Sequence, residues 1–130
     1  MKVLFVEDDP MNRRVVKDML DVAGADMTGA EDAETGLQLI DSQDFDIVLM
    51  DLRMPGMDGL TAISHIRARA DAKSALPVIV VTADTAVDLR DRCLSQGADE
   101  VLFKPVAMDS LFDAIGRMLA RSDGGAGMIS

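Results

Sequence analysis

Ile47-Val48-Leu49-Met50-Asp51 is a run of four apolar residues that ends on an aspartate. Continuous rather than alternating apolar residues are typical of a strand that is buried on both faces of a parallel sheet. Two further runs have the same form: Val3-Leu4-Phe5-Val6 before Glu7-Asp8, and Val78-Ile79-Val80-Val81 before Thr82. These runs predict the central strands of a parallel sheet, with polar residues where the strands end.

Amphipathic stretches with helical spacing separate these strands. Gly24 and Gly97 follow two of them, and glycine is favoured just after the last residue of a helix. The repeated order of strand and helix predicts a single doubly wound α/β domain with about five parallel strands and helices on both faces. The predicted helices are Pro10 to Ala23, Ala33 to Ser42, Leu60 to Ala70, Val87 to Gln96 and Met108 to Arg121, and weaker strand candidates are Asp26 to Ala30 and Glu100 to Phe103.

Length and composition suit one compact domain. The chain has 130 residues, of which 48% are hydrophobic, and a net charge of −10. We expect a domain over residues 1–121 and a flexible, glycine-containing tail over residues 122–130. The acidic balance disfavours a nucleic acid or an anionic membrane as a direct partner. The single cysteine excludes an intrachain disulfide, and no leader or long apolar span appears, so we expect a soluble, cytoplasmic protein.

Polar residues at the strand ends predict a phosphoryl site that needs a metal ion. In doubly wound sheets the site forms at the carboxyl ends of the strands, here Glu7-Asp8, Asp51, Thr82 and Lys104. Adjacent carboxylates repel a phosphate unless a divalent cation such as Mg²⁺, which prefers oxygen ligands, lies between them. An ionised Asp51 is then an oxygen nucleophile, while the threonine hydroxyl and the lysine ammonium suit phosphoryl oxygens.

Each of these residues, taken alone, also has a simpler interpretation. The stretch from Glu7 to Pro10 has the acidic residues and the proline of a helix start. Asp51 would serve equally to cap the following turn, and Thr82 is an ordinary residue for a strand end. Lys104 would be a solvated lysine, unless a cis bond to Pro105 turns its ammonium into the site.

Taken together, the motifs resemble the response-regulator receiver domain of two-component signalling. The resemblance runs from about Lys2 to Arg121 and implies a flavodoxin-like (βα)5 fold with strand order 2-1-3-4-5. It implies a signalling phosphoacceptor, not an enzyme beyond self-phosphorylation and autodephosphorylation, whose donor is a phosphohistidine on a histidine kinase or phosphotransfer protein. The motifs that carry it are Glu7-Asp8, Asp51-Leu52-Arg53-Met54-Pro55-Gly56-Met57-Asp58-Gly59, Thr82-Ala83 and Lys104-Pro105.

The resemblance also implies a role for each residue of the site. Asp51 would accept the phosphoryl group. Mg²⁺ would be held by Asp8, Asp51 and the carbonyl of Arg53, with Glu7 helping through water. The residues that would contact the phosphoryl group are Thr82, Ala83 and Lys104.

Conformational switching is the point where the sequence departs from the family. The switch region would comprise Thr82, Val101 and Pro105, but the family often has tyrosine or phenylalanine where this chain has Val101. Valine has no ring to couple to the threonine, so a switch would need the loop from Thr82 to Val87 to move by another route.

Two further groups of residues have roles that the sequence leaves open. Arg53 and Asp84 would modulate the lifetime of the phosphoryl group by pairing or by contacting it, or they are simply solvated charges. Met11, Arg14 and Val15 on the first helix would dock the kinase, or they serve solvation and packing only.

The order of motifs favours a standalone receiver over two other classes of protein. We expect a phosphorelay intermediate or a diffusible effector that binds another protein. An aspartate-nucleophile phosphohydrolase would have a second aspartate where this chain has Arg53, and a flavin carrier would need a phosphate loop and aromatic residues. Asn12-Arg13 also resembles receivers of hybrid kinases.

Overall fold

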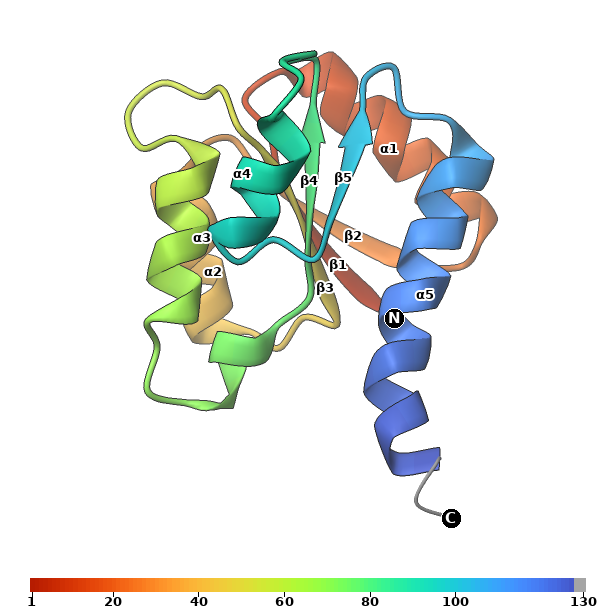
Figure 1. The fold of residues 1–130 in the computed structure, drawn as a ribbon. Helices are drawn as coiled ribbons and strands as arrows, with labels where there is room; N and C mark the ends of the chain where they lie inside the picture. Colours follow the sequence, from red (N-terminus) through yellow and green to blue (C-terminus); the bar gives the residue numbers. More distant parts are fainter. Residues whose placement is uncertain (128–130) are drawn as a thin grey trace.

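A computed structural model describes the backbone of residues 1–127 and the side chains of residues 1–121. The described chain forms a parallel five-stranded sheet in the order β2-β1-β3-β4-β5 (Figure 1). The predicted doubly wound α/β fold and its strand order are thereby confirmed. The strands are β1 (Lys2–Val6), β2 (Asp26–Ala30), β3 (Ile47–Asp51), β4 (Val78–Thr82) and β5 (Glu100–Phe103); the helices are α1 (Pro10–Val22), α2 (Ala33–Ser42), α3 (Gly59–Arg67), α4 (Leu89–Ser95) and α5 (Met108–Gly127), with a 3-10 helix η1 (Ala72–Ala75) before β4.

Helices cover both faces of the sheet, as the continuous apolar strands predict. Successive strand residues point to opposite faces, so Val48 and Met50 of β3 pack in one core and Ile47 and Leu49 in the other. The first core is closed by α2, α3 and α4, and the second by α1 and α5. Figure 1 shows the two groups of helices on opposite sides of the sheet. The interiors of β1, β3 and β4 are therefore apolar on both faces, and polar side chains gather where these strands end.

Aspartates begin three of the helices that follow these strand ends. The side chains of Asp9, Asp32 and Asp58 accept hydrogen bonds from backbone N–H groups in the first turns of α1, α2 and α3, at 2.8, 2.7 and 2.8 Å. Such caps satisfy donors that have no partner within the helix. At the first helix the simpler interpretation is thus correct for Asp9-Pro10, and it leaves Glu7 and Asp8 free of the capping role.

Several element bounds differ from the prediction. Helix α4 begins at Leu89 rather than Val87, because the Asp84 side chain accepts a hydrogen bond from Ala86 N at 3.0 Å and holds the chain in a turn. The short helix η1 was not predicted. Helix α5 continues past the predicted end at Arg121 to Gly127. Of the predicted flexible tail, residues 128–130 lie outside the described residues, and the mobility of the tail stays a prediction.

Gly59 allows α3 to begin directly against the end of β3. Its N–H donates to the Leu52 carbonyl at 3.0 Å, and a Cβ atom at position 59 would lie 2.3 Å from the backbone oxygen of Asp51. No side chain other than hydrogen fits at that distance unless the backbone moves. The close approach therefore determines where Asp51 sits relative to the loop that follows it.

Replacing Gly59 by alanine is expected to lower the free energy of unfolding by roughly 1–3 kcal/mol, because the added methyl group overpacks a backbone contact. Urea unfolding measures the change. The matched control is Gly116→Ala in α5, where a Cβ atom would meet nothing within 4 Å. Alanine is the better helix former, so the control is expected to gain about 0.5–1 kcal/mol. Equal effects of the two substitutions would contradict the packing argument.

Candidate functional site

Four neighbouring strands bring the predicted site residues to one edge of the sheet. Glu7 and Asp8 follow β1, Asp51 and Thr82 end β3 and β4, and Lys104 follows β5. Because β1, β3, β4 and β5 are adjacent and parallel, their carboxyl ends lie at the same edge. The sheet thus brings together residues that are separated by as many as 97 positions in the chain.

Three carboxylates form a cluster at this edge. One oxygen from each of Glu7, Asp8 and Asp51 lies within 4.8 Å of the others. The Glu7 and Asp51 residues are only 1% and 4% exposed, whereas Asp8 is exposed. This combination fits Mg²⁺, which takes hard oxygen ligands and keeps several waters that need an open side.

Lys104 provides the positive charge of the cluster. Its Nζ donates to Glu7 Oε1 at 2.6 Å and lies 3.6 Å from Asp51 Oδ1. The Lys104-Pro105 bond is cis, and the ammonium faces the site as that interpretation required. Burial alone lowers the pKa of Lys104, but the hydrogen bond to Glu7 and the charge of Asp51 outweigh it, so the net pKa lies above 10.5. The lysine therefore stays charged at neutral pH.

The buried Thr82 joins β4 to the loop beside the cluster. Its Oγ1 accepts a hydrogen bond from Asp84 N at 3.1 Å, and its carbonyl accepts one from Lys104 N at 2.8 Å. Ala83, between Thr82 and Asp84, is exposed. The threonine hydroxyl thus keeps its own proton available as a donor.

Arg53 and Asp84 form an ion pair between the loops that follow β3 and β4. Arg53 Nη2 lies 2.8 Å from Asp84 Oδ2, and the backbone N–H of Arg53 points to Asp51 Oδ1 at 3.5 Å. The hydrogen bond from Arg53 lowers the pKa of the Asp84 carboxyl, and the Ala86 N–H adds to this effect. Of the alternatives that the sequence left open for Arg53, the structure has pairing with Asp84.

Two residues of α1 contact Glu7, a function that sequence reasoning did not assign to them. Asn12 Nδ2 donates to Glu7 Oε1 at 3.2 Å, and Arg13 Nη1 donates to the Glu7 carbonyl at 2.6 Å. The Arg13 side chain runs past Gly29, where a Cβ atom would lie 3.0 Å from Arg13 Cδ. The sequence signal was the placement of two residues with hydrogen-bond donors, an asparagine and an arginine, about one turn after the acidic pair on the helix that follows it.

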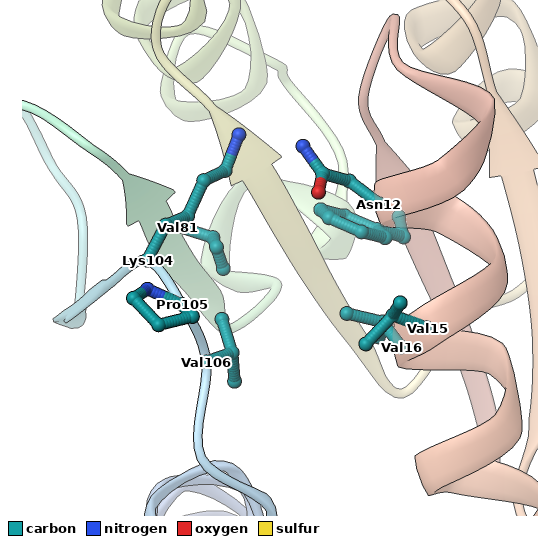
Figure 2. A pocket seen from close by; sticks show the side chains of 8 residues that line it. Asn12, Val15, Val16, Val81, Lys104, Pro105 and Val106 are labelled. Atoms are coloured by element: carbon teal, nitrogen blue, oxygen red, sulfur yellow. The ribbon is translucent and has the colours of Figure 1, made fainter.

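A small cavity of about 150 Å³ adjoins the cluster between α1 and the loop after β5. Its walls are mostly apolar, with Asn12 and Lys104 as its polar members (Figure 2). Of the predicted docking residues, Val15 lines the cavity and Met11 is 68% exposed, whereas Arg14 pairs with Asp18 at 3.1 Å. The full lining is Phe5, Asn12, Val15, Val16, Val81, Lys104, Pro105 and Val106.

The predicted switch position, Val101, lies in the hydrophobic core. It is 4% exposed and packs with the residues that α4 covers. The aromatic side chain of this strand is Phe103, which is 46% exposed and pairs in register with Thr82. Pro105 lies in the wall of the cavity beside α1.

Comparison with known proteins agrees with the geometry of the site. The family described as response regulator receiver domain matches residues 3–116. The chain is 39% identical over 111 residues to the sensor histidine kinase RcsC of Salmonella typhi, a match that covers 85% of this chain and 11% of that protein. It is 37% identical over 116 residues to the response regulator protein FleR of Pseudomonas aeruginosa, covering 89% of this chain and 24% of FleR. The chain therefore spans only a small part of these relatives.

Solved structures of receiver domains have the same fold. The receiver domain of sensor histidine kinase PA1611 from Pseudomonas aeruginosa, determined with a magnesium ion coordinated in its active-site cleft, matches with a TM-score of 0.83 and 32% identity over 92% of this chain and 97% of that chain. The Francisella response regulator 1452 receiver domain matches with a TM-score of 0.85 and 28% identity, over 93% and 98% of the two chains. Within residues 1–127, no helix is long and apolar enough to cross a membrane.

Asp8→Asn is expected to raise the free energy of unfolding of the metal-free protein by about 1 kcal/mol at neutral pH, because it removes one of three clustered carboxylates. A hydrogen bond with Glu7, then burial and the charge of Glu7, raise the pKa of Asp8 above 3.8. The folded wild type therefore binds a proton before the unfolded chain does as the pH falls. The gain in stability of Asp8→Asn is complete at pH values above the raised pKa of Asp8 and is lost at pH values below about 3.8.

Urea unfolding in the presence of a chelator, from about pH 7 to about pH 3.5, tests this dependence. Asp44→Asn is the control, because that side chain is 98% exposed, and it is expected to change stability by less than about 0.5 kcal/mol. An advantage of Asp8→Asn that stays constant over the whole range would contradict the repulsion argument.

Proposed function

Because this chain belongs to the response regulator receiver domain family, we propose that Asp51 is its phosphoacceptor and that Mg²⁺ is its cofactor. Receiver domains of two-component signalling accept a phosphoryl group on an aspartate, and histidine kinases phosphorylate them. The observation that carries the proposal is the cluster of Glu7, Asp8 and Asp51 at the sheet edge, with Lys104 against it. Asp51 ends a buried strand at the centre of this cluster.

The charges of the cluster suit one divalent cation. With all groups ionised, three carboxylates and one ammonium sum to −3 + 1 = −2, which one Mg²⁺ balances. Asp8, Asp51 and the carbonyl of Arg53 would be its protein ligands, with Glu7 acting through a water. When bound, the ion supplies positive charge that offsets the charge of an incoming phosphoryl group.

Phosphoryl transfer requires little of the protein beyond position and charge. A carboxylate oxygen of Asp51 attacks the phosphorus of a phosphohistidine in line. The new O–P bond forms as the N–P bond breaks, and the electron pair of that bond stays on the imidazole nitrogen. The Lys104 ammonium, the Thr82 hydroxyl and the backbone at Ala83 would bind the phosphoryl oxygens.

The partner that carries the phosphohistidine would dock on α1. A histidine kinase or phosphotransfer protein must bring its imidazole to Asp51, and the cavity beside Lys104 adjoins that position. Val15 lines the cavity and Met11, which precedes the lining residue Asn12, is exposed, so both would contact the partner, while Arg14 would offer a charge on the same helix. An apolar pocket with a polar rim is the usual form of an anchor site.

Phosphorylation would be reported through Thr82, Val101 and Pro105. The buried Val101 has no ring that could change place when the threonine turns toward a phosphoryl oxygen. The loop from Thr82 to Val87 would therefore move instead, since most of its residues are exposed, and the ion pair and hydrogen bonds of Asp84 would rearrange with it. The chain then acts as a phosphorelay intermediate or as an effector that a protein partner recognises.

Asp51→Asn is expected to abolish phosphorylation by a phosphohistidine donor in the presence of Mg²⁺, because the amide lacks the nucleophilic oxygen anion. A chelator is expected to have the same effect on the wild type. Asp58→Asn is the matched control, since asparagine caps α3 as well as aspartate does. Label transfer from a phosphorylated kinase or phosphotransfer protein measures these outcomes, and undiminished labelling of Asp51→Asn would refute the assignment.

A time course of label transfer, from the histidine donor to this chain and back again, separates the role of relay intermediate from that of effector. Rapid return of the label to a histidine donor identifies a relay intermediate. A long-lived phosphoaspartate that binds a new protein identifies an effector. Multiple turnover of a phosphate ester that depends on Asp51 would instead favour a phosphohydrolase.

Arg53→Ala is expected to speed the loss of phosphate from Asp51 by up to about five-fold, because an exposed ion pair that restricts water is worth roughly 0–1 kcal/mol. Asp84→Asn breaks the same pair and should have a similar effect. Decay of the labelled protein after removal of the donor measures the rate. Unchanged decay in both variants would eliminate a gating role for the pair.

A further inference from the structure

Glu7 is a buried carboxylate with few partners. It is 1% exposed, and its Oε1 accepts hydrogen bonds from Lys104 Nζ at 2.6 Å and Asn12 Nδ2 at 3.2 Å. Its Oε2 has a longer contact of 3.4 Å with the N–H of Asp9. A buried carboxylate that loses its counter-ion is strongly destabilised unless other donors remain.

Lys104 is bound to Glu7 rather than to Asp51 in this structure. The two distances, 2.6 Å to Glu7 and 3.6 Å to Asp51, show which carboxylate the ammonium serves. If Asp51 accepts a phosphoryl group, as proposed above, we expect the Lys104 ammonium to shift from Glu7 toward the phosphoryl oxygens. The step is thus an exchange of partners, and its cost depends on what stays with Glu7.

We propose that Asn12 is a positioning residue whose amide keeps Glu7 hydrogen-bonded when Lys104 transfers to the phosphoryl group. Asn12 and Lys104 donate to the same oxygen of Glu7. Figure 2 shows the two side chains coming from α1 and from the loop after β5, with their nitrogen atoms on the same side of the cavity. The amide is neutral, so it hydrogen-bonds the Glu7 carboxylate without competing with Lys104 for the phosphoryl group.

The start of α1 holds Asn12 in place for this role. Arg13 donates to the Glu7 carbonyl at 2.6 Å, and the Asp9 side chain caps the helix through Met11 N at 2.8 Å. These contacts attach the first turn of α1 to the end of β1. The amide is therefore positioned by the backbone and has no need to follow the lysine.

The proposal predicts that loss of the Asn12 amide destabilises the form in which Lys104 has moved more than it destabilises the resting protein. In the resting protein Glu7 keeps the lysine, so Asn12→Leu should change stability little. In the phosphorylated form, or with the phosphoryl mimic beryllofluoride, Glu7 of the variant would lose both protein donors at Oε1 and would keep only water and the longer contact with the N–H of Asp9. We expect Asn12→Leu to weaken beryllofluoride binding at saturating Mg²⁺ by about ten-fold or more, the size of a hydrogen bond to a charged group.

The experiment compares two affinities and the stability of the full chain and its variants. The chain has no tryptophan, so amide chemical shifts are the readout for Mg²⁺ alone and for beryllofluoride in saturating Mg²⁺. Urea unfolding of the same proteins reports stability. Asn12→Gln keeps an amide donor and should recover part of the lost beryllofluoride affinity. Lys17→Ala, on the exposed side of α1, is the control and should leave every value unchanged.

Each outcome either supports or overturns the proposed role of Asn12. A selective loss of beryllofluoride affinity in Asn12→Leu, with partial recovery in Asn12→Gln, supports the positioning role. An unchanged beryllofluoride affinity, or a loss matched by Mg²⁺ affinity or by stability, overturns it and leaves Asn12 a structural residue. A wild-type chain that fails to bind beryllofluoride at all would refute the phosphoacceptor function itself, which keeps the two failures distinct.

Discussion

The contact between Lys104 and Glu7 links the loop after the last strand to the end of the first strand. Buried ion pairs are poor evidence of net stability, because desolvation offsets much of the attraction, but removing one partner is costly. Here the pair neutralises only one of three carboxylates that the sheet gathers at its edge. The remaining negative charge suits a cation, and the proposed phosphoryl chemistry depends on this imbalance.

At the ends of β1 and β3, some acidic residues begin a helix and others belong to the carboxylate cluster. After β1, Asp9 and Pro10 begin α1, while Glu7 and Asp8 face the cluster. After β3, Asp51 belongs to the cluster, and seven residues later Asp58 caps α3. The interpretation of an acidic stretch as a helix start therefore holds for Asp9 and Asp58, while Glu7, Asp8 and Asp51 belong to the cluster of the proposed cation site.

The face around β5 differs from what a receiver with an aromatic switch would offer. Val101 is part of the core and has little freedom, while Phe103, two residues further along the same strand, is half exposed beside Thr82. Next to Val101, the buried Glu100 pairs with Arg90 of α4 and with Arg117 of α5 at 3.1 Å. Helices α4 and α5 are thereby both linked to β5 by ion pairs.

The sequence by itself determined the class of fold and the members of the cluster. Continuous apolar runs need cover on both faces, and in a parallel sheet their ends meet, so Glu7, Asp8, Asp51, Thr82 and Lys104 were predictable from local pattern. The tertiary structure decided what each polar group contacts: Lys104 on Glu7 rather than Asp51, Arg53 on Asp84, and Asn12 on the buried carboxylate. Such choices depend on differences of about 1 Å between side chains from separate elements, and local sequence pattern does not encode those distances.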